Sequence, residues 1–423
     1  MSRDESLDLE ATEGFVRRHM HQGGAQALEK ILESFTSAAP SQPLVCSNNH
    51  LPARMESIGL QEKSLRTILG EVPYRRRGYR CPKCGVIRYP ADKALNVVGT
   101  GFSPGVRRMM ARMGAKECFA EGAQDLQFFA EVRADAKDVE RVAENTGRLV
   151  EDWAAQQRTL ALLAPPDERP DTLYIEFDGT GIPMRAEELA GSRGKGPDGK
   201  AHTREVKLGC VFTQTTQDAN GKPVRDPHTT TYVGAIENSV EFGYRIHAEA
   251  ARRGLANARR VIVLTDGAAY NKTIIAEHFP NAIHVLDICH ATEHLADFVR
   301  EVCRLPANGA FFQQAYDLLY HGKIPALLKR MQAALPRSGP RRDLGEKQTN
   351  YFKENAHAMR YDEFRAMGIF VGSGVIEAGC KTVIAKRLKC SGMFWSLPGA
   401  NAIIALRCCF ASGTFEQFWE ATA

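Results

Sequence analysis

The sequence has no long apolar run. Its apolar stretches, such as VIVL at 261–264 and IIAL at 403–406, fall far short of the ~18 residues that a membrane-spanning helix needs. The first residues, MSRDESLDLE, are acidic where a secretory signal would be basic and then apolar. Glycine (36) and proline (20) are near ordinary usage for 423 residues, which excludes collagen-like and low-complexity classes. With 43% hydrophobic and 25% charged residues, we expect a soluble intracellular protein of several domains, without a membrane partner.

The cysteine count and the charge distribution narrow the class further. Eleven cysteines, an odd number without a secretory signal, argue against a disulfide framework and favour metal binding or buried thiols. The net charge of +5 is small, but residues 65–90 hold seven basic residues and one acid, and residues 372–410 hold five and one. Two basic stretches indicate a polyanionic partner, although a solvated face would explain a single such run.

The first part of the chain has the pattern of a helix, short strands, then helices. Three breaks rich in Pro, Gly, Ser or charge, at 36–43, 164–171 and 336–343, are typical of linkers or long loops. Apolar spacing predicts a helix over 5–35 and short strands over 65–90, and Ser103-Pro104 opens helices over 104–160. A second helix from near Asp135 makes a helix-turn-helix with Lys137 and Arg141 a possible interpretation, and two packed helices without a DNA role fit almost as well.

From residue 172 the pattern becomes that of an α/β fold. The segment TLYIEFDG alternates, which places Leu173, Ile175 and Phe177 on one face and Tyr174, Glu176 and Asp178 on the other. The remaining elements are expected to be strands at 206–212, 230–236, 260–266 and 283–288, helices at 239–254 and between the last two strands, a long helical stretch over 290–367, and a final helix from near Gly374. This order predicts an antiparallel meander of the first three strands, with parallel neighbours after it.

Three carboxylates stand where a metal site could form. Asp178 and Asp266 each close an apolar strand before a glycine, at the strand ends where ligands collect in α/β sheets. The alternative is that Asp-Gly marks a simple turn. Glu377 follows the flexible Gly-Ser-Gly and begins a helix whose bases are Lys381, Lys386, Arg387 and Lys389. Two magnesium (or manganese) ions held by such acids can stabilise the attacking and leaving oxygens of a phosphoryl displacement.

These residues resemble a known family. The strand order with Asp178, Asp266 and Glu377 is similar to the RNase H-like core of DDE transposases, and the wording GSGVIEAGCK…RLKCSGMFW resembles the ISKra-type bacterial insertion-sequence transposases. The segments FDGTG, LTDG and DICHATEH match other parts of the pattern, so that the resemblance runs from about residue 44 to 415. It implies that the three acids are a metal-binding catalytic triad and that a helical insertion separates the last two.

The resemblance also suggests a domain order. We expect an N-terminal helical segment (1–40), a zinc-ribbon-like basic domain (44–95), a helical, helix-turn-helix-like DNA-binding region (103–163), the first part of an RNase H-like mixed-sheet core (172–298), a helical insertion (299–367) and the C-terminal part of the core (368–415).

The segment LDICHATEH permits more than one interpretation. Asp287 and His290 fit an Asp-x-x-His pattern of several DDE superfamilies, which would support the active site. His290, Glu293 and His294 also spell His-x-x-Glu-His, the inverted zinc-peptidase helix, in which two histidines share one face. Simple surface histidines on a helix are the third possibility.

A zinc site is predicted near residue 81. Cys81 and Cys84 form a Cys-x-x-Cys knuckle, and Cys46 and His50 are its natural upstream partners, in the place where members of the resembling family carry a second cysteine pair. A reduced cysteine pair in a turn is the alternative. The strands of this ribbon would carry basic residues toward DNA. Together with the helices, the residues expected to contact DNA are Arg75, Arg76, Arg77, Arg80, Lys137, Arg141, Lys381, Lys386, Arg387 and Lys389.

The sequence therefore predicts a DNA transposase. It would cut insertion-sequence ends and join them to target DNA by two-metal phosphoryl transfer, with transposon-end and target duplexes as partners. The family further implies a homodimer or larger synaptic assembly, located in the bacterial cytoplasm on the nucleoid. A non-catalytic or repurposed DNA-binding protein of transposase origin is the main alternative, and the zinc peptidase is a more distant one.

Overall fold

The computed structural model describes residues 8–190 and 201–422, which group into two compact units. Unit 1 comprises residues 8–144 with 419–422, and unit 2 comprises residues 145–418. The boundary at 144/145 lies inside the predicted region 103–163, within one long helix, α5 (Ala136–Leu163). The predicted N-terminal segment 1–40 lies outside the described residues up to position 7.

Unit 1 consists of a long hairpin with a helix against it, and a helical cluster. Its elements are α1 (Leu9–Thr36), β1 (Val45–Cys46), β2 (Ala53–Arg54), β3 (Glu56–Thr67), β4 (Gly70–Arg80), β5 (Ile87–Arg88), α2 (Pro90–Ala94), α3 (Pro104–Lys116), α4 (Phe119–Ala130) and the start of α5. The helix predicted over 5–35 is present from Leu9 to Thr36, and its first predicted positions, 5–7, lie outside the described residues. The capping of α3 is confirmed, because Ser103 Oγ accepts the N–H of Val106 at 3.3 Å. The helices α3, α4 and α5 share a core that includes Val106, Met110 and Leu126.

Unit 2 is built on a mixed five-stranded sheet. Its elements are β6 (Thr172–Pro183), η1 (Ala186–Leu189), β7 (Thr203–Gln214), β8 (Thr216–Gln217), β9 (Pro223–Val224), β10 (Thr231–Ala235), α6 (Ser239–Arg252), η2 (Leu255–Asn257), β11 (Arg260–Thr265), α7 (Ala269–His278), β12 (Ile283–Leu286), α8 (Ile288–Asp297), η3 (Phe298–Val302), α9 (Ala310–Tyr320), α10 (Ile324–Ala333), α11 (Pro340–Glu354), η4 (Ala356–Ala358), α12 (Tyr361–Ala366), α13 (Gly374–Gly379), η5 (Cys380–Ala385), α14 (Lys386–Leu388), α15 (Leu397–Ala411) and α16 (Phe415–Thr422), whose last turn belongs to unit 1.

The sheet confirms the predicted strand pattern. The order across it is β10-β7-β6-β11-β12, with β7 antiparallel to β6 and β10, and with β11 parallel to both β6 and β12. The first three strands form a meander because each returns beside its predecessor, whereas α7 carries the chain back between the parallel strands β11 and β12. The helical stretch that follows β12 is also present as predicted, from α8 to α12.

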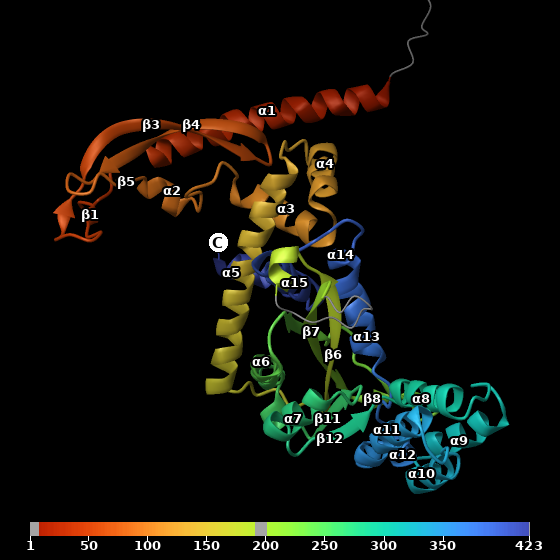
Figure 1. Cartoon of the computed structure of the whole chain (residues 1–423). Coiled ribbons are helices and arrows are strands. Elements are labelled where there is room, and N and C mark those ends of the chain that lie inside the picture. Colours follow the sequence, from red (N-terminus) through yellow and green to blue (C-terminus); the bar gives the residue numbers. More distant parts are fainter. Residues whose placement is uncertain (1–7, 191–200, 423) are drawn as a thin grey trace, which may run out of the picture. The chain divides into compact units, whose positions relative to one another are not determined.

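The two faces of β6 carry different side chains, as the alternation predicts. Leu173, Ile175 and Phe177 belong to a core formed with α6, α7 and β11. Glu176 and Asp178 face the opposite layer, where α13 and η5 lie against β6 and β7 (Figure 1). Both layers cover β6, so its first six residues are all buried. Glu176 is therefore an acid in the interior, whereas alternation alone would allow an exposed polar face.

The helix that carries Glu377 comes very close to the sheet. A Cβ built on Gly379 would lie 2.7 Å from Cε1 of Tyr232 on β10 and 3.2 Å from Cδ2 of Leu208 on β7. Glycine permits this approach because it presents no side chain at the contact. The sequence from Gly374 to Leu388 is helical throughout, with a π-helical segment, η5, in its middle.

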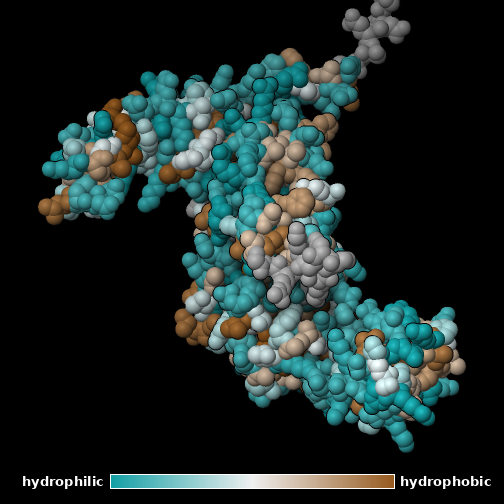
Figure 2. All heavy atoms as spheres, viewed as in Figure 1, coloured by the Kyte–Doolittle hydropathy of each residue, from teal (hydrophilic) through white to brown (hydrophobic). Residues whose placement is uncertain are grey.

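The surface agrees with a protein that folds around internal cores. On the face seen in Figure 2, hydrophilic residues predominate and apolar ones lie in small separate patches. Among residues 8–190 and 201–422, no helix has the length and apolar character that crossing a bilayer would require.

Candidate functional site

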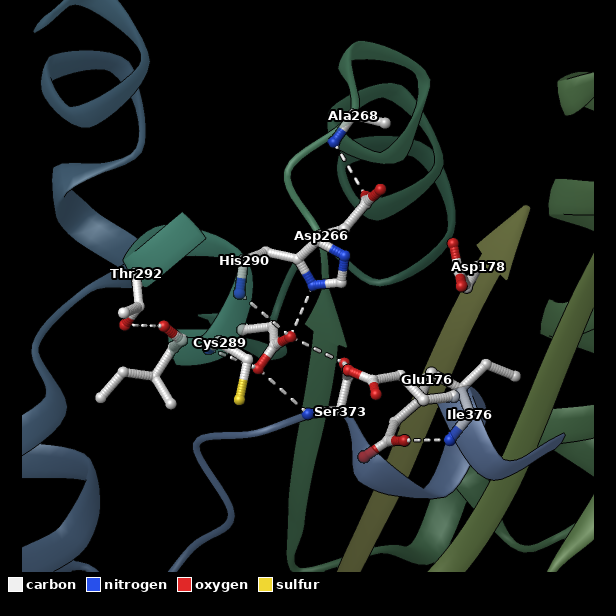
Figure 3. A network of polar contacts seen from close by, with 12 residues as sticks. Glu176, Asp178, Asp266, Ala268, Cys289, His290, Thr292, Ser373 and Ile376 are labelled. Atoms are coloured by element: carbon white, nitrogen blue, oxygen red, sulfur yellow. Dashed lines mark hydrogen bonds and ion pairs between the residues drawn. The ribbon is translucent and has the colours of Figure 1, made fainter. Parts of the chain in front are cut away.

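Asp178 lies on β6, and Asp266 directly follows the adjacent parallel strand β11. The register between β6 and β11 pairs Glu176 with Leu264, and both aspartates lie two residues farther along their chains. Figure 3 shows their carboxylates on the same side of the sheet. Burial raises the pKa of Asp178, and the negative charge of Asp266 raises it further. The two half-buried carboxylates repel each other when both are ionised. A divalent cation bound between them would relieve this repulsion.

Local hydrogen bonds fix the orientation of Asp266. Its Oδ1 accepts the N–H of Ala268 at 3.0 Å and the amide Nδ2 of Asn271 at 2.7 Å. Gly267 has φ +84°, a left-handed conformation that glycine adopts without strain, so the chain turns away from the sheet here. Tyr351 on α11 donates to the carbonyl of Asp266 at 3.1 Å. The second carboxylate oxygen of Asp266 has no hydrogen bond to the described residues, so its lone pairs are available to a metal ion.

Glu377 belongs to a second group of side chains beside the aspartates. Candidate ligand atoms of Asp287, His290 and Glu377 all lie within 4.8 Å of one another. His290 interacts with both groups: the charge of Asp266 contributes to the raised pKa of His290, and the charge of His290 offsets part of the rise in the pKa of Asp178. Figure 3 shows the His290 ring close to Asp266, on the side of the sheet where Asp178 lies.

Asp287 is engaged by protein donors. It caps α8 through Cys289 N–H at 3.1 Å, and its Oδ2 lies 2.6 Å from Nδ1 of His290 and 3.0 Å from Oγ of Ser373. Burial opposes its ionisation, but these hydrogen bonds lower its pKa below the ordinary value. The hydrogen bond to Asp287 is also the largest cause that raises the pKa of His290 to about 9. Asp287 therefore orients His290, and a supporting role of both residues at an active site stays a prediction.

By ligand type the predicted triad suits magnesium or manganese. Among the described residues, however, Glu377 lies within ion-sharing distance of Asp287 and His290, and Asp178 and Asp266 are outside that group. Asp178, Asp266 and Glu377 offer carboxylate oxygens, which are the ligands that hard divalent cations prefer. Cys380 also lies here, with its Sγ 3.7 Å from Oδ2 of Asp178, and burial raises the pKa of this thiol to about 12. A protonated thiol is a weak ligand, so the carboxylates are the groups available to hold the ion.

The inverted peptidase pattern does not assemble a zinc site. Within the described residues, the groups of side chains placed to share an ion include His290 but not His294. His294 instead stacks on Tyr351 at 3.8 Å between ring centroids and lies 2.8 Å from Oε1 of Gln348. Because the two histidines have different partners, the geometry does not favour the peptidase interpretation.

The four predicted zinc ligands come together in unit 1. Ligand atoms of Cys46, His50, Cys81 and Cys84 all lie within 4.8 Å of one another, so this cluster could bind zinc. The sulfurs of Cys46 and Cys84 are 3.8 Å apart, and Cys81 Sγ is 3.4 Å from Nε2 of His50. Tetrahedral zinc with ordinary Zn–S and Zn–N bonds requires separations of about 3.8 and about 3.5 Å. The two printed separations are therefore close to those of a tetrahedral zinc site.

The backbone of the knuckle favours the thiolate form. Cys81 accepts the N–H of Gly85 through its carbonyl at 2.9 Å, and Gly85 completes the turn with φ +72°. The N–H of Val86 is the largest cause that lowers the pKa of Cys84. A lowered thiol pKa eases the proton loss that metal binding requires.

Two of the basic residues predicted to contact DNA are buried, which corrects that prediction. Arg76 is 9% exposed, pairs with Asp92 at 2.9 Å and stacks on Tyr89. Arg387 is fully buried beside Trp395. Both side chains turn inward because they have partners inside the protein: Asp92 and Tyr89 for Arg76, and Trp395 for Arg387. The spacing of basic residues in the sequence cannot reveal these partners. A guanidinium enclosed in this way cannot reach a phosphate backbone.

The other basic residues reach the surface to different degrees. Arg75, Arg80, Lys137, Arg141, Lys381, Lys386 and Lys389 are exposed or partly exposed, and Arg77 is half-buried. Several already have partners in the protein: Arg75 pairs with Glu33, Lys137 with Glu140 and Arg141 with Asp138. The ammonium of Lys389 donates to Oγ1 of Thr180, two residues beyond Asp178. These side chains remain candidates for DNA contact.

Comparison with known proteins finds no match by sequence and only distant likenesses among solved structures. No family model matches the chain, and no curated protein sequence does. Among solved structures, the Drosophila P element transposase strand transfer complex aligns over 74% of this chain and 80% of its own, with 9% identity and a TM-score of 0.24. A likeness at this level carries no argument about family or chemistry, so the function must be inferred from the site itself.

Proposed function

We propose that this protein is a metal-dependent DNA transposase with an RNase H-like core. The observation that carries the proposal is the placement of Asp178 on β6 and of Asp266 directly after the adjacent parallel strand β11, each two residues beyond the paired Glu176 and Leu264, with Glu377 on a helix that covers the same face. The sheet order β10-β7-β6-β11-β12 agrees with the core that the sequence resembles. The domain boundaries expected from the sequence and the family assignment belong to this proposal.

Each acid in the proposed triad has a distinct support. Asp178 is held on the strand, Asp266 is oriented by Asn271 and Ala268, and Glu377 is carried by the helix that begins at Gly374. Together they would hold two magnesium or manganese ions. Metal ions in such a site stabilise charge on the attacking and leaving oxygens of an in-line phosphoryl displacement. The proposed reaction is hydrolysis at the transposon end, followed by attack of the freed 3′-hydroxyl on target DNA.

The remaining parts would bind and position DNA. Lys381, Lys386 and Lys389 reach the surface on the helical segment that follows Glu377, where phosphate contacts would lie beside the acids. The Cys/His cluster in unit 1 would hold a structural zinc that fixes a ribbon carrying Arg75 and Arg80. The helices α3–α5 would supply contacts to the transposon end, with Lys137 and Arg141 as candidates. Assembly as a homodimer or larger complex remains part of the proposal.

The test is metal-dependent cutting by purified protein. The substrate is a supercoiled plasmid that carries the DNA flanking the protein's own gene, with Mg²⁺ or Mn²⁺ added. We expect Asp178→Asn and Asp266→Asn each to lower the nicking rate by at least about 10²-fold, because several kcal/mol of charge stabilisation is removed. DNA binding, measured by gel shift, should persist.

The control is Asp317→Asn, which changes an exposed acid on α9 and should nick at the parental rate. Nicking by Asp178→Asn equal to that of the parent would refute the nuclease proposal. DNA binding without any metal-dependent cutting by the parent would instead support the repurposed DNA-binding protein.

A further inference from the structure

A fourth acid lies under the proposed triad. Glu176 precedes Asp178 by two residues on β6, so both side chains project from the same face of the sheet. It is fully buried, and its Oε2 accepts the backbone N–H of Ile376 at 2.9 Å (Figure 3). Ile376 immediately precedes Glu377. One hydrogen bond therefore joins the strand that carries Asp178 to the helical turn that carries Glu377.

This hydrogen bond replaces a cap that the helix lacks. The first N–H groups of a helix have no partner within it, and a serine at the N-cap would ordinarily accept one of them. Ser373 occupies that position in α13 but makes no side-chain capping bond. Its hydroxyl lies 3.0 Å from Oδ2 of Asp287 and 3.4 Å from Oε1 of Glu377. The N–H of Ile376 is accepted instead by Glu176, which is 200 positions away in sequence.

The start of α13 is thus held by two acids, one on β6 and one that directly follows β12. Glu176 reaches it from β6, and Asp287, which follows β12, accepts the N–H of Ser373 at 3.3 Å. Neither contact is needed to bury apolar surface. The other carboxylate oxygen of Glu176 is also buried and has no hydrogen-bond partner among the described residues. Burying an unpaired polar atom is unfavourable, so an apolar side chain would serve stability better at this position.

We infer that Glu176 is a positioning residue for the metal site, which sets the distance between Asp178 and Glu377 by accepting the N–H of Ile376. This inference rests on the proposed function, because it concerns the ligands of the same metal ions. Glu176 itself acts through the backbone of α13 and does not contact the ion. Partners that orient metal ligands typically change metal affinity by 10–100-fold when they are removed.

The experiment compares three substitutions by direct Mn²⁺ binding and by thermal unfolding. Glu176→Leu removes the acceptor and keeps a side chain of similar size, whereas Glu176→Gln keeps an oxygen that can accept the N–H of Ile376. Ile175→Val alters the opposite face of the same strand and is the control for packing alone. Free Mn²⁺ is measured by electron paramagnetic resonance, so that the readout does not depend on DNA cutting.

Glu176→Leu should weaken Mn²⁺ binding by about tenfold or more. Its unfolding temperature reflects two opposing changes, because the variant removes the unpaired buried Oε1 and also leaves the N–H of Ile376 without an acceptor. The affinity of Glu176→Gln for Mn²⁺ should stay within about threefold of that of the parent, a much smaller change than the one expected for Glu176→Leu. Ile175→Val should lower the unfolding temperature and leave Mn²⁺ affinity unchanged. A merely structural role for Glu176 would instead lower the unfolding temperature and leave the affinity intact, and this result would overturn the inference.

The design separates failure of the inference from failure of the proposed function. If the parent binds Mn²⁺ and Asp178→Asn does not, but Glu176→Leu binds as tightly as the parent, only the positioning role is refuted. If the parent and Asp178→Asn bind Mn²⁺ equally, the carboxylates do not form the metal site. The proposed function then fails, and the positioning role fails with it.

Discussion

Replacing Gly379 with alanine should disturb the site by displacing the helix that carries Glu377. The added Cβ would lie 2.7 Å from Cε1 of Tyr232, a distance that real Cβ atoms essentially never show. The main chain that carries the ring is held in place, because the backbone N–H of Tyr232 donates to Oγ of Ser412 at 2.8 Å, so the contact is relieved only by rotation of the ring or by movement of the helix. Overpacking of this kind costs about 1–3 kcal/mol. In a unit of this size, the unfolding temperature would fall by roughly 2–10 °C.

Catalysis should suffer more than stability. Relief of the contact requires α13 to move away from β7 and β10, and a shift of about 1 Å in a reacting group can cost about 10²-fold in rate. The matched control is Gly374→Ala in the same helix, where a Cβ would meet nothing within 4 Å. This change should stabilise the protein by about 0.5–1 kcal/mol, because alanine favours helix over glycine.

Calorimetry and single-turnover cleavage of plasmid DNA provide the two readouts. We expect Gly379→Ala to reduce both stability and cleavage rate, and Gly374→Ala to reduce neither. If Gly379→Ala unfolded at the parental temperature and cut at the parental rate, the argument that close packing of α13 on the sheet positions Glu377 would be wrong.

Three further predictions concern the zinc cluster, the basic helix and a partly buried histidine. The parent should contain one zinc per chain, and Cys81→Ser should release it. Loss of the zinc should speed amide hydrogen exchange in β1, β2 and β5 but not in the long β3–β4 hairpin. A variant with the zinc content and exchange rates of the parent would contradict this prediction. Replacing Lys381, Lys386 and Lys389 together with glutamine should weaken DNA binding. The slope of log K against log salt concentration should become shallower by roughly 0.9 for each phosphate that is no longer neutralised. Arg387→Gln should mainly lower the unfolding temperature, because the Arg387 side chain is buried. Burial lowers the pKa of His284 to about 4, so the neutral form stabilises the fold above pH 6.5 and this stability is lost as the pH falls toward 4. His284→Gln should flatten the stability profile across that window by up to about 3 kcal/mol, and an unchanged profile in denaturant titrations would refute the assignment.

The sequence was sufficient to predict the sheet because its signals are local. Alternation along 172–178 identified β6 and both of its faces, and the apolar strands before Asp266 and Asp287 identified β11 and β12. The cysteine spacing likewise identified all four members of the Cys/His cluster. In each case the residues that define the feature lie within a few positions of one another, or in two short segments with a known pairing rule.

Features that depend on distant partners could not be predicted. Arg387 looked like part of an exposed basic helix, but it is buried beside Trp395. Asn271 carried no sequence signal for its hydrogen bond to Asp266. Glu176 did give a signal, because a charged residue inside an apolar strand is unusual. Its hydrogen-bond partner Ile376, however, lies 200 positions later in the sequence. These contacts depend on how elements distant in sequence pack together, and the hydrophobic periodicity of each element does not predict that packing.

The most direct test of the central claim is to locate the metal. A crystal of the protein grown or soaked with Mn²⁺ gives an anomalous signal that marks each ion independently of the surrounding density. The account predicts a Mn²⁺ ion bound by the carboxylates of both Asp178 and Asp266, with Glu377 on the same side of the sheet. Mn²⁺ bound elsewhere, with the two aspartates turned to opposite faces of the sheet, would contradict it.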